Sequence, residues 1–78
     1  FERYVEKNMI YPQLANEKGI EKEVEVRFYV DENGIPTQFE TQGNDEYGFE
    51  KEAIRLIQEG PKWKPSNREV IVLIRFEL

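Results

Sequence analysis

The chain of 78 residues contains neither cysteine nor histidine, and Ser66 is its single serine. Without cysteine there are no disulfide bonds and no thiolate metal sites. Without histidine the chain lacks the commonest general base and zinc ligand, and a serine triad for acyl transfer is excluded. The sequence therefore predicts a protein that is not an enzyme and that uses no cofactor.

A phosphate-binding loop, a nucleic-acid partner and a membrane-spanning helix are all disfavoured by the composition of the chain. Its five glycines are scattered, so no glycine-rich phosphate loop is present. Its net charge of −5 argues against a nucleic acid as partner, because phosphate binding needs a basic surface. No apolar run approaches the ~18–20 residues of a membrane-spanning helix.

The charge is unevenly distributed along the chain. Residues 1–50 carry 5 Lys/Arg and 12 Asp/Glu, a net of −7, whereas residues 51–78 carry 6 and 4, a net of +2. This split is typical of solvated faces, but it also fits a mildly basic second half that binds an acidic partner. The periodicity places Glu23, Glu25, Glu50 and Glu52 on solvent faces, where carboxylates serve solubility.

Two helices are predicted in the first twenty residues. Phe1, Tyr4 and Val5 recur at helical spacing. A second, short helix is predicted from Gln13 to Lys18, with Pro12 before its first turn and Gly19 after its last.

A β-hairpin is predicted next. Apolar residues alternate with polar ones from Glu23 to Val30, which is the pattern of a strand with one buried face. Asp31 to Gly34 is a turn in which Asn33 and Gly34 tolerate positive φ. The alternation resumes from Ile35 to Thr41 as the returning strand.

A third helix and a third strand complete the chain. The helix is predicted from Phe49 to Gln58, with Asn44 or Asp45 as its cap and Gly60 as its end. The strand is the apolar run from Val70 to Leu78. Both faces of this run are apolar, so the strand is either covered on both faces or an exposed edge strand that tends to pair with another chain.

These elements follow the order helix, helix, strand, strand, helix, strand. The order predicts an α+β fold with a three-stranded antiparallel sheet and helices packed on one face, formed by residues 1–78 as one small domain. Among the aromatic residues, Phe28, Phe39, Phe49 and Phe76 fall on faces predicted to be buried. Tyr4, Tyr11 and Trp63 either seal the core or offer a platform to a ligand; Trp63 is held between Pro61 and Pro65.

Several motifs together resemble the C-terminal domain of the TonB family. Asn8 to Pro12 is similar to its N-x-x-Tyr-Pro signature, and Gly19 to Phe28 is similar to its Gly-Ile-Glu-Gly…Val-x-Val-x-Phe block. Asp31 to Gly34 matches its hairpin, and Pro61 to Pro65 its Trp-x-Pro junction. The chain departs from the pattern at Lys22, where the family usually has glycine, and in a short link, residues 66–69.

The resemblance implies a periplasmic domain of a TonB-like energy transducer, part of a longer protein anchored in the inner membrane. Such a domain binds the TonB box, a short N-terminal segment of an outer-membrane receptor, by strand addition. Inner-membrane motor proteins, reached through the N-terminal region of the longer protein, couple it to the proton-motive force. By family similarity the peptide-binding residues would be Asn8, Tyr11, Pro12, Val72, Leu73, Ile74, Arg75, Phe76 and Glu77.

A second function stays open at this point. The same strand would also serve a TonB-like adaptor or homo-oligomerising module, for example a homodimer, in a larger envelope or sensor protein. Both functions depend on an exposed sheet edge.

Overall fold

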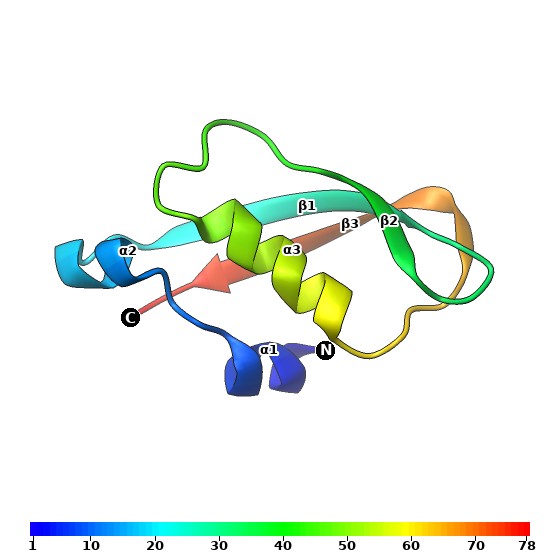
Figure 1. Cartoon of the computed structure of the whole chain (residues 1–78), viewed down its shortest axis with the longest axis horizontal. Helices are drawn as coiled ribbons and strands as arrows, with labels where there is room; N and C mark the ends of the chain where they lie inside the picture. The colour runs from blue at the N-terminus through cyan, green and yellow to red at the C-terminus, as the bar shows by residue number, and fades with distance from the viewer.

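The structure, a computed structural model, describes residues 1–78 and contains three helices and three strands (Figure 1). In chain order these are α1 (Glu2–Asn8), α2 (Gln13–Lys18), β1 (Lys22–Val30), β2 (Pro36–Glu40), α3 (Phe49–Glu59) and β3 (Ser66–Phe76). The predicted α+β fold and the predicted order of its elements are confirmed.

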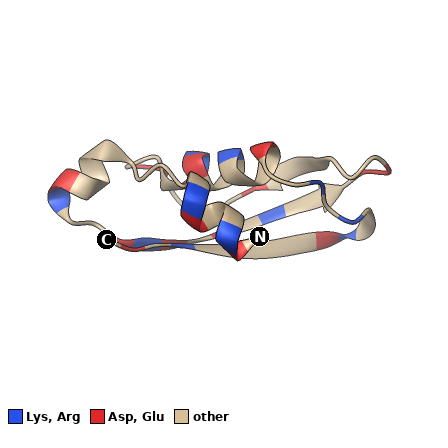
Figure 2. Cartoon of the chain, turned by 90° about the horizontal axis from the view of Figure 1, so that it is seen from below, with Lys and Arg blue, Asp and Glu red and all other residues tan.

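The three strands form one antiparallel sheet in the order β2-β1-β3, with β1 in the centre. Helix α3 lies across one face of this sheet, as Figures 1 and 2 show. The core lies between α3 and the sheet, because the alternate residues of β1 that the pattern placed inside do point there. Its buried apolar residues are Ala15, Val24, Val26, Phe28, Val30, Phe49, Ala53, Leu56, Ile57, Ile74 and Phe76.

Strand β3 differs from the prediction at both ends. It begins at Ser66 rather than Val70, and it ends at Phe76 rather than Leu78. Residues 66–69, which the sequence pattern assigned to a link, belong to the strand because Ser66 pairs with Val30 across an irregularity in the β1–β3 register. The bulge breaks the alternation of period two, so the pattern does not show that residues 66–69 continue the strand.

The hairpin turn is organised by the side chain of Asp31. Its carboxylate accepts the N–H groups of Asn33 and Ile35, each at 2.9 Å. Only Gly34 adopts a positive φ, at 80°, and Asn33 does not. Strand β2 then carries Gln38 at φ 56°, where the β1–β2 register shifts, so the returning strand is shorter than predicted.

The N-cap of α3 is Gly48 rather than Asn44 or Asp45 as predicted, but the side chain of Asp45 makes the capping hydrogen bonds. Gly48 occupies the position just before the helix, at φ 89°, and has no side chain to bond with. The two carboxylate oxygens of Asp45 instead accept the N–H groups of Glu50 and Lys51, each at 3.1 Å. Desolvation alone raises the pKa of Asp45, but these hydrogen bonds from Glu50, Lys51 and Gly48 outweigh it, and the pKa is lowered.

Asp45→Ala should therefore destabilise the domain by about 1 kcal/mol at neutral pH, the usual effect of losing a helix cap. A lowered pKa in the folded state means that the ionised carboxylate stabilises the fold above the ordinary value of 3.8. The difference between wild type and variant should shrink as the pH falls below that value. Urea unfolding at a series of pH values measures it; a difference independent of pH would show that Asp45 acts through packing.

The prediction that Glu50 and Glu52 face solvent is wrong. Glu50 is 4% exposed and Glu52 is 9% exposed. Glu50 forms an ion pair with Lys22. Glu52 accepts hydrogen bonds from the N–H of Ile10 and from Nε and Nη2 of Arg55, each at 2.7 Å. Helical periodicity does place both carboxylates on the polar side of α3, but Ile10 and Lys22, the first residue of β1, lie against that side.

Candidate functional site: an open sheet edge beside a short helix

Strand β3 has a hydrogen-bonding partner on one side only, because it lies at the end of the strand order. The direction of its free backbone groups follows from β1. The N–H of Asp31 donates to Ile35, on the β2 side, at 3.0 Å. Since backbone groups of successive residues in an antiparallel strand point to opposite sides, the odd-numbered residues of β1 face β2 and the even-numbered ones face β3.

The same alternation identifies the free donors of β3. Val24 pairs with Ile74, and Val26 pairs with Val72, so the even-numbered residues of β3 bond to β1. The backbone N–H and C=O groups of the odd-numbered residues, Leu73 and Arg75 among them, therefore point away from the sheet. This row is a template for one more strand.

The opposite edge of the sheet is less suited to strand addition. Strand β2 has five residues, compared with eleven in β3. It begins with Pro36, which has no N–H to donate, and it is irregular at Gln38. Short, bulged edge strands with proline resist pairing with another chain.

Helix α1 lies alongside the free edge of β3 (Figure 1). It is fixed by contacts from Phe1, its N-cap, and from two of its own residues. The ring of Phe1 lies 5.1 Å from that of Trp63. The ring of Tyr4 covers Gly60 so closely that a Cβ there would come within 2.8 Å of it. The carbonyl of Asn8 accepts a hydrogen bond from Arg55 at 2.9 Å.

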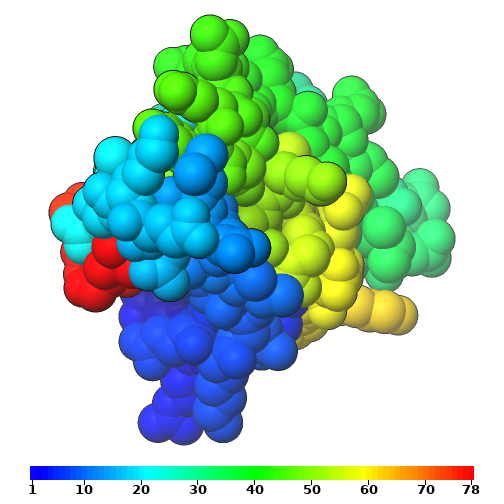
Figure 3. All heavy atoms as spheres, turned by 60° about the vertical axis from the view of Figure 1, so that its left-hand side comes forward, coloured from blue at the N-terminus to red at the C-terminus, as the bar shows by residue number.

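Between α1 and β3 runs a groove with two adjoining hollows. The first, of about 270 Å³, is lined by Phe1, Glu2, Val5, Glu6, Leu73, Ile74 and Arg75. The second, of about 390 Å³, is lined by Val5, Glu6, Met9, Arg75 and Glu77. In Figure 3 the blue α1 lies directly below the red end of β3 at the surface. The groove therefore extends along the edge where a bound strand would lie.

The predicted strand residues divide between the two faces of the sheet. Ile74 and Phe76 are buried in the core, and Val72 is half-buried against it. Leu73, at 58% exposure, and Arg75 lie on the open face, where Arg75 forms an ion pair with Glu77. A bound strand thus pairs with the outward-facing backbone groups of Leu73 and Arg75, and it meets side chains mainly from Leu73, Arg75 and Glu77.

The three predicted residues outside β3 are placed differently. Tyr11 lies at the end of β3: its hydroxyl donates to the carbonyl of Ile20 and reaches that of Phe76 at 3.4 Å. Its ring packs edge-on against Phe76 and Phe49, so it supports the end of the strand. Desolvation, then the nearby carboxylates of Glu21 and Glu77, raise the pKa of Tyr11, which keeps the phenol a donor.

Asn8 and Pro12 lie away from the free edge. The side chain of Asn8 donates to the carbonyl of Tyr4 at 2.9 Å, within its own helix. Pro12 lines a separate hollow beside α3, together with Ile10 and Glu52. The structure thus brings Tyr11 to the candidate strand and leaves the other two on the α3 side of the molecule.

The wall formed by α1 was missed in the sequence analysis, although its signal is present. Phe1, Val5 and Met9 are spaced four residues apart, so they share one face of a helical segment. The pattern indicates a buried stripe, but it does not say which strand lies opposite.

A family model described as Gram-negative bacterial TonB protein C-terminal matches residues 7–78. The chain belongs to this family. The match does not include residues 1–6, which contain most of α1. Domains of this family are periplasmic and interact with outer-membrane receptors.

No curated protein and no solved structure matches the chain. None of its helices is both long and apolar enough to cross a membrane. Lys22, which replaces the usual TonB-family glycine, opens β1 and forms the ion pair with Glu50 described above.

Proposed function

We propose that this TonB C-terminal domain binds the TonB box of an outer-membrane receptor by adding it to the edge of β3. The observation that carries the proposal is the row of outward-facing backbone groups that includes Leu73 and Arg75, at the end of an eleven-residue strand. Strand addition uses backbone hydrogen bonds for affinity and alternate side chains for specificity.

The wider role follows from the family. The domain would belong to a TonB-like energy transducer anchored in the inner membrane, whose motor proteins use the proton-motive force to drive transport through the receptor. Its own part is to hold the receptor, and we propose no catalytic step and no cofactor for it. The hydrogen-bonded ladder suits such a role, because pulling along the strands loads many backbone bonds together.

Titration of a receptor's N-terminal peptide into isotope-labelled domain tests the proposal. The amide signals of Val72 to Glu77 should shift, and those of Leu73 and Arg75 should shift most, because their N–H groups point to the added strand. The amide signals of Thr37 to Glu40, on the other edge, should not shift. Pro36 has no N–H and gives no signal. Shifts confined to β2 would show that the peptide binds the other edge of the sheet, and the assignment to β3 would be wrong.

A homodimeric adaptor module is the second candidate function. The observation that favours it is the pair Ile71 and Leu73, which are 53% and 58% exposed on the open face of β3. Two copies that pair through β3 would satisfy the free backbone groups and set these side chains beside those of the partner strand, which buries part of their surface. Sedimentation of the domain over a range of concentrations shows whether a dimer forms. A dimer that pairs through β3 occupies the peptide-binding edge, so the apparent peptide affinity should fall at concentrations where the dimer forms.

A further inference from the structure

We propose that the groove between α1 and β3 selects the sequence of the bound strand. It would take an aliphatic side chain in the hollow next to Phe1 and Val5, and a lysine or arginine in the hollow next to Glu6 and Glu77. This inference rests on the proposed function, since it assumes that an extended peptide pairs with β3.

Strand geometry brings the peptide's side chains to the two hollows. An added strand lies about 4.8 Å from β3, and its side chains alternate between the two faces of the sheet. Every second side chain therefore points toward α1. The two hollows adjoin, because Val5, Glu6 and Arg75 line both of them. They can thus receive two successive side chains from the face of the peptide that turns toward α1.

The two hollows share Glu6 and Arg75 and differ in their apolar lining. Four of the seven residues around the first are apolar, namely Phe1, Val5, Leu73 and Ile74, and they stabilise an aliphatic group removed from water. In the second hollow, two carboxylates, those of Glu6 and Glu77, accompany one cation, Arg75. Arg75 is already paired with Glu77, which leaves Glu6 without an ion pair.

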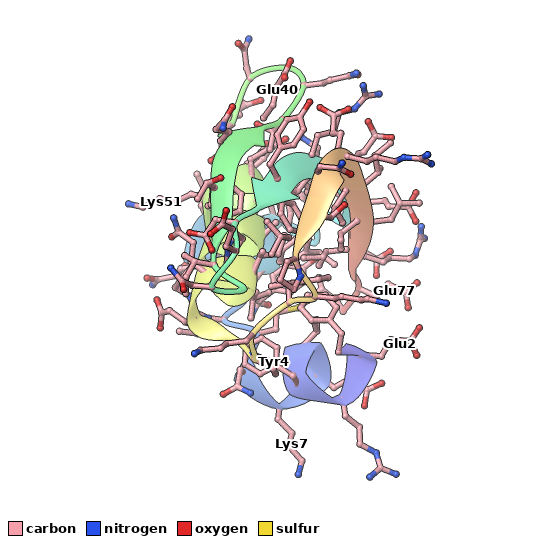
Figure 4. The ribbon with its side chains drawn as sticks, turned by 90° about the vertical axis from the view of Figure 1, so that its right-hand side faces the viewer. Glu2, Tyr4, Lys7, Glu40, Lys51 and Glu77 are labelled. Atoms are coloured by element: carbon pink, nitrogen blue, oxygen red, sulfur yellow. The ribbon has the colours of Figure 1, made fainter.

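The surrounding charges strengthen the same preference. Glu2 also lines the first hollow and forms no ion pair. Figure 4 shows Glu2 and Glu77 on the same side of the molecule, whereas Lys7 points away from the sheet into solvent. An approaching peptide meets a negative rim, which attracts a basic side chain and repels an acidic one.

Most of this wall lies outside the residues that the TonB family model matches, since that match begins at residue 7. The family's shared region therefore supplies the strand, and the preceding residues of this chain supply much of the groove. The groove is thus a feature by which this chain distinguishes between receptor peptides that pair equally well with β3.

The test uses a valine- and threonine-rich peptide into which one lysine or one glutamate is placed at each position in turn. At low salt, lysine at one groove-facing position should bind about 3- to 5-fold more tightly than glutamate there, the size of an exposed ion pair. Raising the salt to 0.5 M should remove most of this difference, because exposed charges are screened.

Two matched variants decide where the preference arises. Glu6→Lys should reverse it, whereas Glu17→Lys, a charge reversal on α2 away from the groove, should leave it unchanged. If both variants change it equally, the preference reflects net charge and the groove proposal is wrong. If no peptide shows a preference while the β3 amides still shift, the groove proposal fails and strand addition stands. If no peptide shifts the β3 amides, the proposed function fails as well.

Discussion

Leu73→Pro should leave the domain folded and weaken binding of a receptor peptide by about 10- to 100-fold. The N–H of Leu73 points away from β1, so its loss breaks no bond of the sheet. A carbonyl of the bound peptide, in contrast, loses its donor on β3 and is left unpaired, which costs about 1–3 kcal/mol of binding free energy. Isothermal titration calorimetry measures the affinity, and circular dichroism confirms the fold.

Ile74→Pro is the matched control for this result. Ile74 pairs with Val24 and is buried, so proline there removes a bond of the ladder and its ring disturbs the core. This variant should be strongly destabilised even without peptide. Arg75→Ala, which removes only an exposed ion pair, should change the affinity by no more than about 1 kcal/mol.

The pattern across the three variants is what tests the edge. Equal effects of proline at positions 73 and 74 on stability would show that the outward direction of the backbone groups has been assigned incorrectly. Full peptide affinity in a folded Leu73→Pro variant would show that binding does not use the backbone of β3.

Local patterns predicted most of the fold. The alternation from Val24 to Val30 marked the central strand, and its buried residues are those that the pattern placed inside. The helix from Gln13 to Lys18 has the predicted bounds, with Gly19 at φ 69° after it. These features depend on residues close together in the chain, and so sequence reveals them.

The errors concern residues whose partners are distant in sequence. Glu50 is buried against Lys22, and Glu52 is buried against the N–H of Ile10, 42 residues earlier. Helical periodicity assigns a face, but it does not reveal that another segment covers that face. A buried carboxylate needs a cation or donors. Arg55 in the same helix supplies them for Glu52, but Lys22 and the N–H of Ile10 come from segments that the pattern leaves unplaced.

The candidate site shows the same division. The apolar last strand was identifiable from its composition, and the family resemblance gave it a role. Which strand lies at the centre, and therefore which backbone groups of β3 are free, depends on pairing across the whole sheet. Predicting the groove also requires the position of α1, since the groove exists only where α1 packs beside β3.

Trp63→Ala should destabilise the domain by about 3–5 kcal/mol, the range for removal of a large aromatic side chain from a packed site. The ring of Trp63 lies 5.1 Å from that of Phe28, edge-on, and 5.1 Å from that of Phe1. Its backbone N–H also donates to the carbonyl of Gly34 at 3.1 Å. Trp63 thus joins the α3–β3 connection to the core, the hairpin and the start of the chain.

Urea unfolding measures this effect, and Tyr29→Ala provides a matched aromatic deletion. Tyr29 is 37% exposed on a face of β1 that no helix covers, so its loss should cost less than about 1 kcal/mol. Equal costs for the two variants would show that Trp63 is a surface residue rather than part of the core. Because Phe1 packs on Trp63 and lines the groove, a folded Trp63→Ala domain should also lose part of its preference for lysine over glutamate.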